Sequence, residues 1–202
     1  RTLCASPSVM RPTSQPTLSF DPSAKTAMDK QEPPAPGADF RVVIVGAGNI
    51  NFGSDEGPWN HSFRLEHKLG PRLKVVALID PDAERARRVL KTKCQSFVLS
   101  AYKDTVVYPT FKDYMASVCA ETYPHAVWVG SPPAFRGGTE PGRNLEQLLT
   151  AGLPNVPLFI EKPVSTGAVD QTFEVAKMLE QNGSLVSVGE QHTKPYTEGE
   201  KK

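Results

Sequence analysis

Three short groups of residues have the types and positions needed to hold a nucleotide and to act on a small carbonyl compound. Gly46-Ala47-Gly48 follows a run of β-branched residues, and two such glycines let the backbone turn tightly and approach phosphate oxygens closely. Asp80 ends a second apolar run, where a carboxylate can accept hydrogen bonds from ribose hydroxyls. Glu161-Lys162-Pro163 ends a third run, and its ammonium group can bind a hydroxyl or take part in proton transfer.

Alternating apolar and amphipathic segments must position these groups. We expect strands at Arg41–Val45, Leu73–Ile79, Val106–Tyr108, Ala126–Val129, Pro157–Ile160 and Leu185–Val188. We expect helices at Trp59–Leu69, Asp82–Lys93, Phe111–Cys119, Asn144–Ala151 and Val169–Gln181. The alternation predicts an α/β fold, a doubly wound parallel sheet with helices on both faces. Because the carboxyl ends of its strands share one edge, the three groups should surround one crevice.

The glycine turn departs from the full dinucleotide fingerprint. That fingerprint has a third Gly three residues after the second, and Asn51 stands there. Asn51–Gly57 looks like an insertion before the next helix, and its Asp55 and Glu56 would repel a pyrophosphate unless they face outward. A glycine turn without a ligand is the alternative interpretation.

Asp80 bears on the choice between NAD and NADP. A carboxylate at the end of the second strand accepts hydrogen bonds from both ribose hydroxyls and repels a 2′-phosphate, which favours NAD. Its distance from Gly48 exceeds the usual ~20 residues, which the insertion explains. Asp80 can instead be a turn or capping acid before Pro81, and the nearby Arg85 can reach a phosphate, so the preference is modest.

The Glu161-Lys162-Pro163 triplet predicts a site only in its context. A lysine at the carboxyl end of a buried strand points into the ligand crevice of an α/β sheet. Pro163 can fix its geometry through a restrained or cis peptide bond. Taken alone, such a triplet is more often a solvated loop.

These motifs together resemble a known family. Gly46-Ala47-Gly48, Asp80, Ser131-Pro132-Pro133 and Glu161-Lys162-Pro163, in this order at strand ends, resemble the amino-terminal domain of the glucose-fructose oxidoreductase, inositol dehydrogenase and MocA family (Gfo/Idh/MocA). The resemblance covers residues 40–189 and implies a Rossmann domain that binds NAD or NADP. The segment Asn49–His61 is similar to a fungal branch of this family.

The resemblance also implies roles for individual residues. Ser131-Pro132 stands where the family's Thr-Pro segment borders the nicotinamide ribose. Lys162 stands where the family lysine positions nicotinamide and substrate, so it is the expected catalytic residue. The expected cofactor-binding residues are Gly46, Gly48, Asn49, Ile50, Asp80, Ser131, Pro132, Glu161 and Lys162.

The resemblance further implies a second α/β domain that carries substrate contacts. This sequence ends soon after its sixth expected strand in a polar tail, residues 190–202, so we expect a truncated chain that is inactive alone. The implied parent reaction is hydride transfer between nicotinamide and a sugar, polyol or related carbonyl compound. Two alternatives stay open: a sensor or regulator that binds dinucleotide without turnover, and a nonfunctional truncated product. A methyltransferase that binds S-adenosylmethionine would leave Glu161-Lys162-Pro163 unexplained.

Composition narrows the class of protein further. The 202 residues suit one domain with tails, and a net charge of +1 gives no electrostatic case for binding nucleic acid. No apolar run approaches the ~20 residues that span a bilayer, so no membrane contact is expected. Three cysteines favour reduced thiols in a cytoplasmic protein. Residues 1–39, rich in Pro, Ser and Thr, are expected to form a disordered tail.

Several other side chains favour structural roles. His61 and His67 are six residues apart, which does not place them on one helix face as metal ligands, so no metal site is expected. Trp59 and Phe63 are four apart and predict a core stripe on their helix. Cys119 is expected to pack at a helix end.

Overall fold

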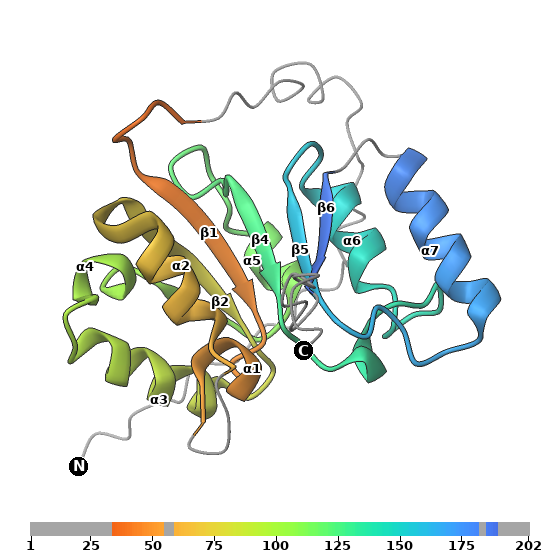
Figure 1. Ribbon diagram of the computed structural model, residues 1–202, viewed down its shortest axis with the longest axis horizontal. Coiled ribbons are helices and arrows are strands. Elements are labelled where there is room, and N and C mark those ends of the chain that lie inside the picture. The colour runs from red at the N-terminus through yellow and green to blue at the C-terminus, as the bar shows by residue number, and fades with distance from the viewer. Residues whose placement is uncertain (1–33, 55–58, 182–184, 190–202) are drawn as a thin grey trace, which may run out of the picture.

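The computed structural model describes residues 34–54, 59–181 and 185–189, and the expected tail at 190–202 and most of that at 1–39 lie outside these ranges. Within these ranges, six parallel strands form one sheet in the order β3-β2-β1-β4-β5-β6 (Figure 1). Their bounds are β1 Phe40–Val45, β2 Leu73–Ile79, β3 Val106–Tyr108, β4 Ala126–Val129, β5 Leu158–Glu161 and β6 Val186–Gly189. The predicted doubly wound sheet is confirmed.

β1 pairs with both β2 and β4. The strands β2 and β3 are added on one side of β1, and β4, β5 and β6 on the other. Val45 lies opposite Ile79 on β2 and opposite Val129 on β4, so these three strands end at the same level. In sheets of this kind, ligands bind in the crevice outside the carboxyl ends at this switch point. In Figure 1 the carboxyl end of β1 points to the lower side of the view, where α1 lies.

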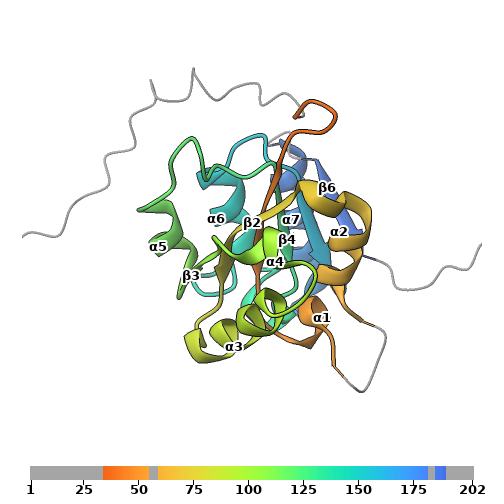
Figure 2. The same cartoon turned by 90° about the vertical axis from the view of Figure 1, so that its left-hand side faces the viewer.

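Helices cover both faces of the sheet. Their bounds are α1 Asn49–Phe52, α2 His61–Leu69, α3 Ala83–Cys94, α4 Leu99–Tyr102, α5 Phe111–Met115, α6 Leu145–Gly152 and α7 Val169–Gln181. One face carries α2, α3 and α4, and the other carries α5, α6 and α7 (Figures 1 and 2). No helix in the described part of the chain is long and apolar enough to cross a membrane.

The central strand β1 supplies both cores because its side chains alternate between the two faces. Val43 and Val45 pack in the core beneath α5, α6 and α7. Val42 and Ile44 pack in the core beneath α2, α3 and α4. A strand buried on both faces must be apolar throughout, which explains the continuous β-branched run that leads into the glycine turn.

Polar side chains fix where three helices begin. Asn60 accepts a hydrogen bond from the N–H of Phe63 at 2.9 Å and caps α2. Asp82 accepts one from the N–H of Arg85 at 2.9 Å and caps α3, while Thr110 caps α5 in the same way. Each cap satisfies a backbone donor that the helix itself leaves without a partner.

The structure corrects the prediction for the segment after the glycine turn. We expected Asn51–Gly57 to be an insertion before the helix, but Asn49–Phe52 already forms the short helix α1. The inserted residues come after α1 and lead to α2. Asp55 and Glu56, the two acidic residues of this segment, lie outside the described residues. The helical turn therefore begins directly at the glycine turn.

Two predictions about packing were wrong. Trp59 is 39% exposed and Phe63 is 60% exposed, because α2 turns His61, Ser62 and Leu65 toward the protein instead. Trp59 precedes α2, which begins at His61, so the two residues form no stripe on one helix.

Cys119 was also misplaced by the prediction. The helix α5 ends at Met115, so Cys119 lies in the following turn, where it is exposed and its N–H donates to Thr122 Oγ1 at 3.0 Å. The short helix α4 was not predicted.

Candidate functional site

The glycine turn connects β1 to α1 and packs against the end of β4. Gly46 has a φ of +97°, and a Cβ atom there would lie 3.0 Å from the backbone nitrogen of Ser131. The N–H of Gly46 donates to the carbonyl of Ile79 at 2.8 Å, which joins the turn to β2. Glycine suits both the dihedral angle and this close approach.

Gly48 borders open space. Its backbone is extended (φ −79°, ψ 177°), and no atom lies within 4 Å of the place where its Cβ would stand. The N–H groups of Asn49 and Ile50 begin α1, where a helix leaves its first donors without internal partners. Gly48, Asn49 and Ile50 thus border a position where backbone donors can meet an anion.

Asn51 takes the place of the third fingerprint glycine and is fully buried. Its side-chain N–H donates to the carbonyls of Val45 and Gly46 at 3.1 and 2.7 Å. A Cβ on Gly130 would lie 2.3 Å from Asn51 Oδ1, so the side chain fills the contact between the turn and β4. The missing glycine is therefore replaced by a side chain that stabilises the turn, which the motif alone did not predict.

Asp80 is buried directly beneath the glycine turn. Its Oδ2 accepts a hydrogen bond from the N–H of Ala47 at 2.6 Å. Its Oδ1 accepts from the N–H of Asp82 and from the guanidinium of Arg85, both at 2.8 Å. The Asp80 carboxylate thus stabilises the turn, and Arg85, 43% exposed, lies at its outer side.

Arg136, in the loop after β4, is fully buried and connects that loop to the loop after β5. Its guanidinium donates to the carbonyl of Ser131 at 2.9 Å, to that of Val164 at 3.0 Å and to that of Glu161. Glu146 on α6 lies 3.9 Å from it and accepts a hydrogen bond from the N–H of Gly137 at 2.8 Å. One side chain therefore fixes the backbone of both expected nicotinamide loops.

Glu161, the last residue of β5, pairs with His61, the first residue of α2. His61 Nε2 lies 2.7 Å from Glu161 Oε2, and the two residues are 1% and 4% exposed. The His61 ring contacts Phe159 edge-on, with 5.0 Å between ring centroids, and Phe159 stacks on Trp128. The Glu161 side chain is thus held by a histidine whose own ring packs against aromatic side chains of β4 and β5.

Burial sets the protonation of these groups. It lowers the pKa of His61, against the raising effect of Glu161, so the ring is held neutral and can donate Nε2–H to the carboxylate. Burial also lowers the pKa of Arg136 and raises that of Glu146, and the charge of each opposes the effect on the other. Arg136 stays a cation, because a guanidinium does not lose its proton in proteins.

Lys162 follows Glu161 at the carboxyl end of β5 and is exposed. The peptide bond between Lys162 and Pro163 is cis, as the sequence suggested. Ser131 and the exposed Pro132 follow β4, the neighbouring strand. The Ser131 hydroxyl is buried and has no partner among the described residues. The structure thus places all the predicted site residues at the carboxyl-end edge of the sheet.

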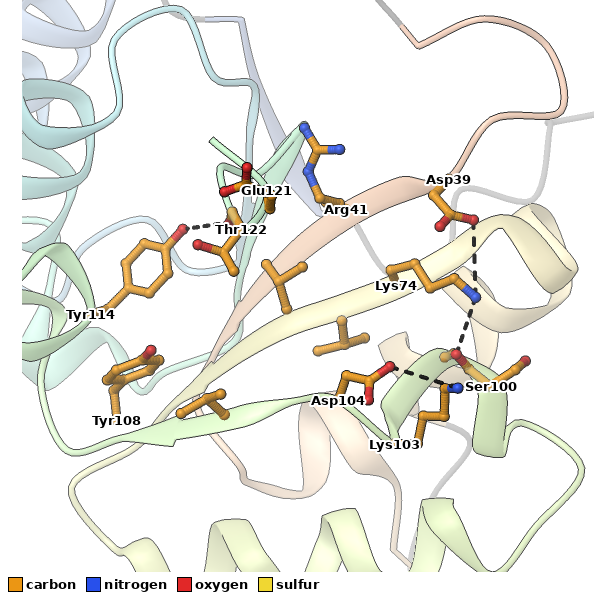
Figure 3. Close-up of a pocket in the computed structure, with 14 residues that line it drawn as sticks. Asp39, Arg41, Lys74, Ser100, Lys103, Asp104, Tyr108, Tyr114, Glu121 and Thr122 are labelled. Atoms are coloured by element: carbon orange, nitrogen blue, oxygen red, sulfur yellow. Dashed lines mark hydrogen bonds and ion pairs between the residues drawn. The ribbon is translucent and has the colours of Figure 1, made fainter. Parts of the chain in front are cut away.

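A surface pocket of about 470 Å³ lies elsewhere, beside the amino-terminal halves of β1 and β2 (Figure 3). None of the predicted site residues lines it. Lys74 in this pocket lies 4.0 Å from Asp39 and donates to the carbonyl of Ser100 at 3.2 Å, while Lys103 lies 3.9 Å from Asp104. Within the described residues, no group of three or more metal-ligating side chains is found.

Comparison with known proteins agrees with this geometry. Residues 40–190 match the family model described as "Oxidoreductase family, NAD-binding Rossmann fold" (Gfo/Idh/MocA), and the chain belongs to this family. It is similar to the uncharacterized proteins C12C2.04 and UNK4.17 of Schizosaccharomyces pombe, with 42% and 41% identity. These matches cover 76% and 79% of this chain and 40% of each relative, so the chain spans about two fifths of their length.

Two solved structures share the fold. The WlbA dehydrogenase from Bordetella pertussis, in complex with NADH and UDP-GlcNAcA, aligns with a TM-score of 0.53, 16% identity, 78% of this chain and 40% of that one. A super-repressor mutant of Gal80p from Saccharomyces cerevisiae aligns with a TM-score of 0.51, 17% identity, 74% of this chain and 34% of that one. At these identities the likeness shows the fold alone.

Three buried residues of the site were missed by sequence reasoning. His61 was assigned a structural role, and Arg136 and Glu146 were not singled out. The only signal for His61 was its place near the start of the helix expected at Trp59–Leu69. Arg136 stands in a glycine-rich loop where a charged residue is ordinarily solvated, so its burial was not predictable from its neighbours.

Proposed function

We propose that the chain binds NAD(H) across the carboxyl ends of β1 and β4 and belongs to an oxidoreductase that transfers hydride between nicotinamide and a sugar, polyol or related carbonyl compound. The main support for this proposal is the glycine turn, which contacts the end of β4 and leaves open space beside Gly48. The pyrophosphate would lie against the N–H groups of Asn49 and Ile50. The match to an NAD-binding family supports the same position.

Lys162 is our candidate for the catalytic side chain. Bound cofactor supplies the hydride chemistry, and this chain's residues orient it and hold a proton donor near it. Lys162 and Ser131 follow neighbouring strands at the proposed nicotinamide end, so the lysine ammonium can bind the oxygen of a carbonyl or alcohol there. Residues 40–189 supply the cofactor half, and the remaining substrate contacts come from outside it.

A preference for NAD over NADP is part of this proposal and rests on Asp80. The buried carboxylate lies between the glycine turn and Arg85, near the expected adenosine ribose. Its negative charge disfavours a 2′-phosphate, whereas the Arg85 guanidinium reduces that repulsion. The preference should therefore be modest.

A turnover assay tests whether this chain alone holds a complete site. The chain would be incubated with NAD⁺ and sugars or polyols, or with NADH and their oxidised forms, while nicotinamide absorbance is followed. We expect cofactor binding without robust turnover from this chain. Robust turnover that disappears in Lys162→Ala would overturn the expectation that a further domain completes the site.

A regulator that binds dinucleotide without turnover is the second candidate, because the Gal80p super-repressor mutant shares the fold. A longer protein containing this chain would separate the two. The oxidoreductase proposal expects nicotinamide-dependent turnover that Lys162→Ala abolishes, and cofactor binding without any turnover would favour the regulator.

A further inference from the structure

Glu161 is the residue through which the Glu161-Lys162-Pro163 turn is attached to the rest of the domain. Its side chain is held by His61 on α2, with 2.7 Å between Nε2 and Oε2. Its carbonyl is held by Arg136, which donates from the opposite loop. His61 is one hundred residues away in sequence and Arg136 is twenty-five, so the turn is fixed from two independent elements.

We propose that His61 and Arg136 are positioning residues for Lys162, which they hold toward the nicotinamide end of the bound cofactor by fixing Glu161. The proposal rests on the proposed function, because it assumes that NAD(H) lies across the turn. It goes further by assigning a role to two buried residues that belong to none of the recognised motifs.

The contacts of His61 fit this role better than a role in general packing. A buried histidine adds less to a core than an apolar side chain of similar size, since its polar atoms must be desolvated. His61 Nδ1 and Glu161 Oε1 find no partner among the described residues, so the pair tolerates an electrostatic cost at this place. What the pair contributes in return is a directional bond to the residue before Lys162.

The hydrogen bonds of Arg136 also support a positioning role. Its three carbonyl acceptors belong to residues 131, 161 and 164, all in the loops after β4 and β5. A planar guanidinium can bind several carbonyls in fixed directions, which a lysine ammonium cannot reproduce. Arg136 therefore ties the backbones of the two loops together on either side of Lys162.

The test compares NADH with ADP-ribose, which has the same adenosine and pyrophosphate but no nicotinamide. Affinities of both would be measured by calorimetry for the wild-type chain, His61→Leu, His61→Gln and Lys162→Ala. In His61→Leu, NADH affinity should fall by about tenfold while ADP-ribose affinity changes by less than about twofold. His61→Gln keeps a side-chain N–H donor for Glu161 and should recover most of the NADH affinity.

Leu65→Ala is the matched control, because Leu65 is buried one turn further along α2 and belongs to the core beneath it. It loosens the same helix without touching Glu161. A merely structural role for His61 predicts that His61→Leu and Leu65→Ala alter the ratio of the two affinities alike. The proposal predicts that only His61→Leu alters it.

A double mutant tests whether His61 acts through Lys162. Combined with Lys162→Ala, His61→Leu should cause no further loss of NADH affinity, since the residue that it positions is gone. Additive losses would overturn the proposal, and so would an unchanged affinity ratio in His61→Leu. If His61→Leu does not fold, Arg136→Lys takes its place in the same comparison.

Failure of the proposed function gives a different result. A folded wild-type chain that binds neither NADH nor ADP-ribose would contradict the cofactor site itself. Binding of both ligands with no selective effect of His61 or Arg136 would contradict only the positioning role.

Discussion

The two halves of the candidate site are stabilised in different ways. In the half formed by β1 and β2, the motif residues stabilise one another: Asp80 accepts the N–H of Ala47, and Gly46 donates to Ile79. In the half formed by β4 and β5, the motif residues are held by two buried ionisable residues outside the motifs, Arg136 in the loop after β4 and His61 on α2. The first half is thus held by bonds among the motif residues and their strands, and the second by two buried side chains that lie outside the motifs.

This difference separates two consequences of mutation. Gly48 lies at open space in the first half, so a change there can alter ligand binding without disturbing the fold. Arg136 is fully buried in the second half, so a change there alters stability and geometry together. The comparison therefore predicts which substitutions act on affinity and which act on folding.

The largest effect on stability should come from Arg136→Met. Removing the cation leaves Glu146 buried without its ionic partner and leaves three carbonyls without their donor. The free energy of unfolding, measured by urea denaturation, should fall by about 3–5 kcal/mol. A loss below about 1 kcal/mol would put this pair in the range of surface ion pairs and remove the contrast between the halves.

Gly48→Val should weaken cofactor binding and leave the fold intact. A branched side chain there points into space that the phosphate oxygens would occupy, while the backbone angles of Gly48 suit any residue. The dissociation constant for NADH should rise at least about a hundredfold, ~2.8 kcal/mol, with an unchanged circular dichroism spectrum. The control is Gly48→Ala, which should weaken binding less, and undiminished affinity in folded Gly48→Val would rule out this turn as the pyrophosphate site.

Asp80→Ser should weaken NAD binding and narrow the gap to NADP. The serine cannot reproduce the charged bonds to Ala47 and Arg85, and it no longer repels a 2′-phosphate. We expect a loss of about 1–3 kcal/mol in NADH affinity, measured by calorimetry beside NADPH. Arg85→Gln is the control and should widen the difference in affinity between NADH and NADPH. A wild-type chain that prefers NADPH would show that the charge of Arg85 outweighs that of Asp80.

The smallest predicted effect is on the pH dependence of stability. Burial lowers the folded-state pKa of His61, so below about pH 6.5 the unfolded chain binds a proton that the folded chain resists. Stability should therefore fall as the pH decreases from 7.5 to 5.5, and His61→Gln should reduce this slope in urea denaturation. Burial also lowers the pKa of His125, so His125→Asn is the parallel variant that should leave the His61 contribution in place. An equal slope in wild type and His61→Gln would contradict a neutral buried ring.

Sequence predicted the fold well because its signals were local. β-branched runs and turn residues located all six strands, and the helix expected at Asp82–Lys93 matches α3 within one residue at each end. The residues that hold the second half of the site gave no such signal. Whether Arg136 is solvated or buried depends on where Glu161 and Val164 bring their carbonyls, and this follows only from the packing of distant loops. The same is true of His61, whose partner is one hundred residues away.

Isothermal titration of the 202-residue chain with NADH tests the central claim most directly. We expect saturable binding at one site per chain, which a tenfold excess of ADP-ribose suppresses by competition at the shared pyrophosphate position. The same titration with folded Gly48→Val should give little heat. Absence of binding by the folded wild-type chain, or equal binding by Gly48→Val, would contradict a cofactor site at the glycine turn.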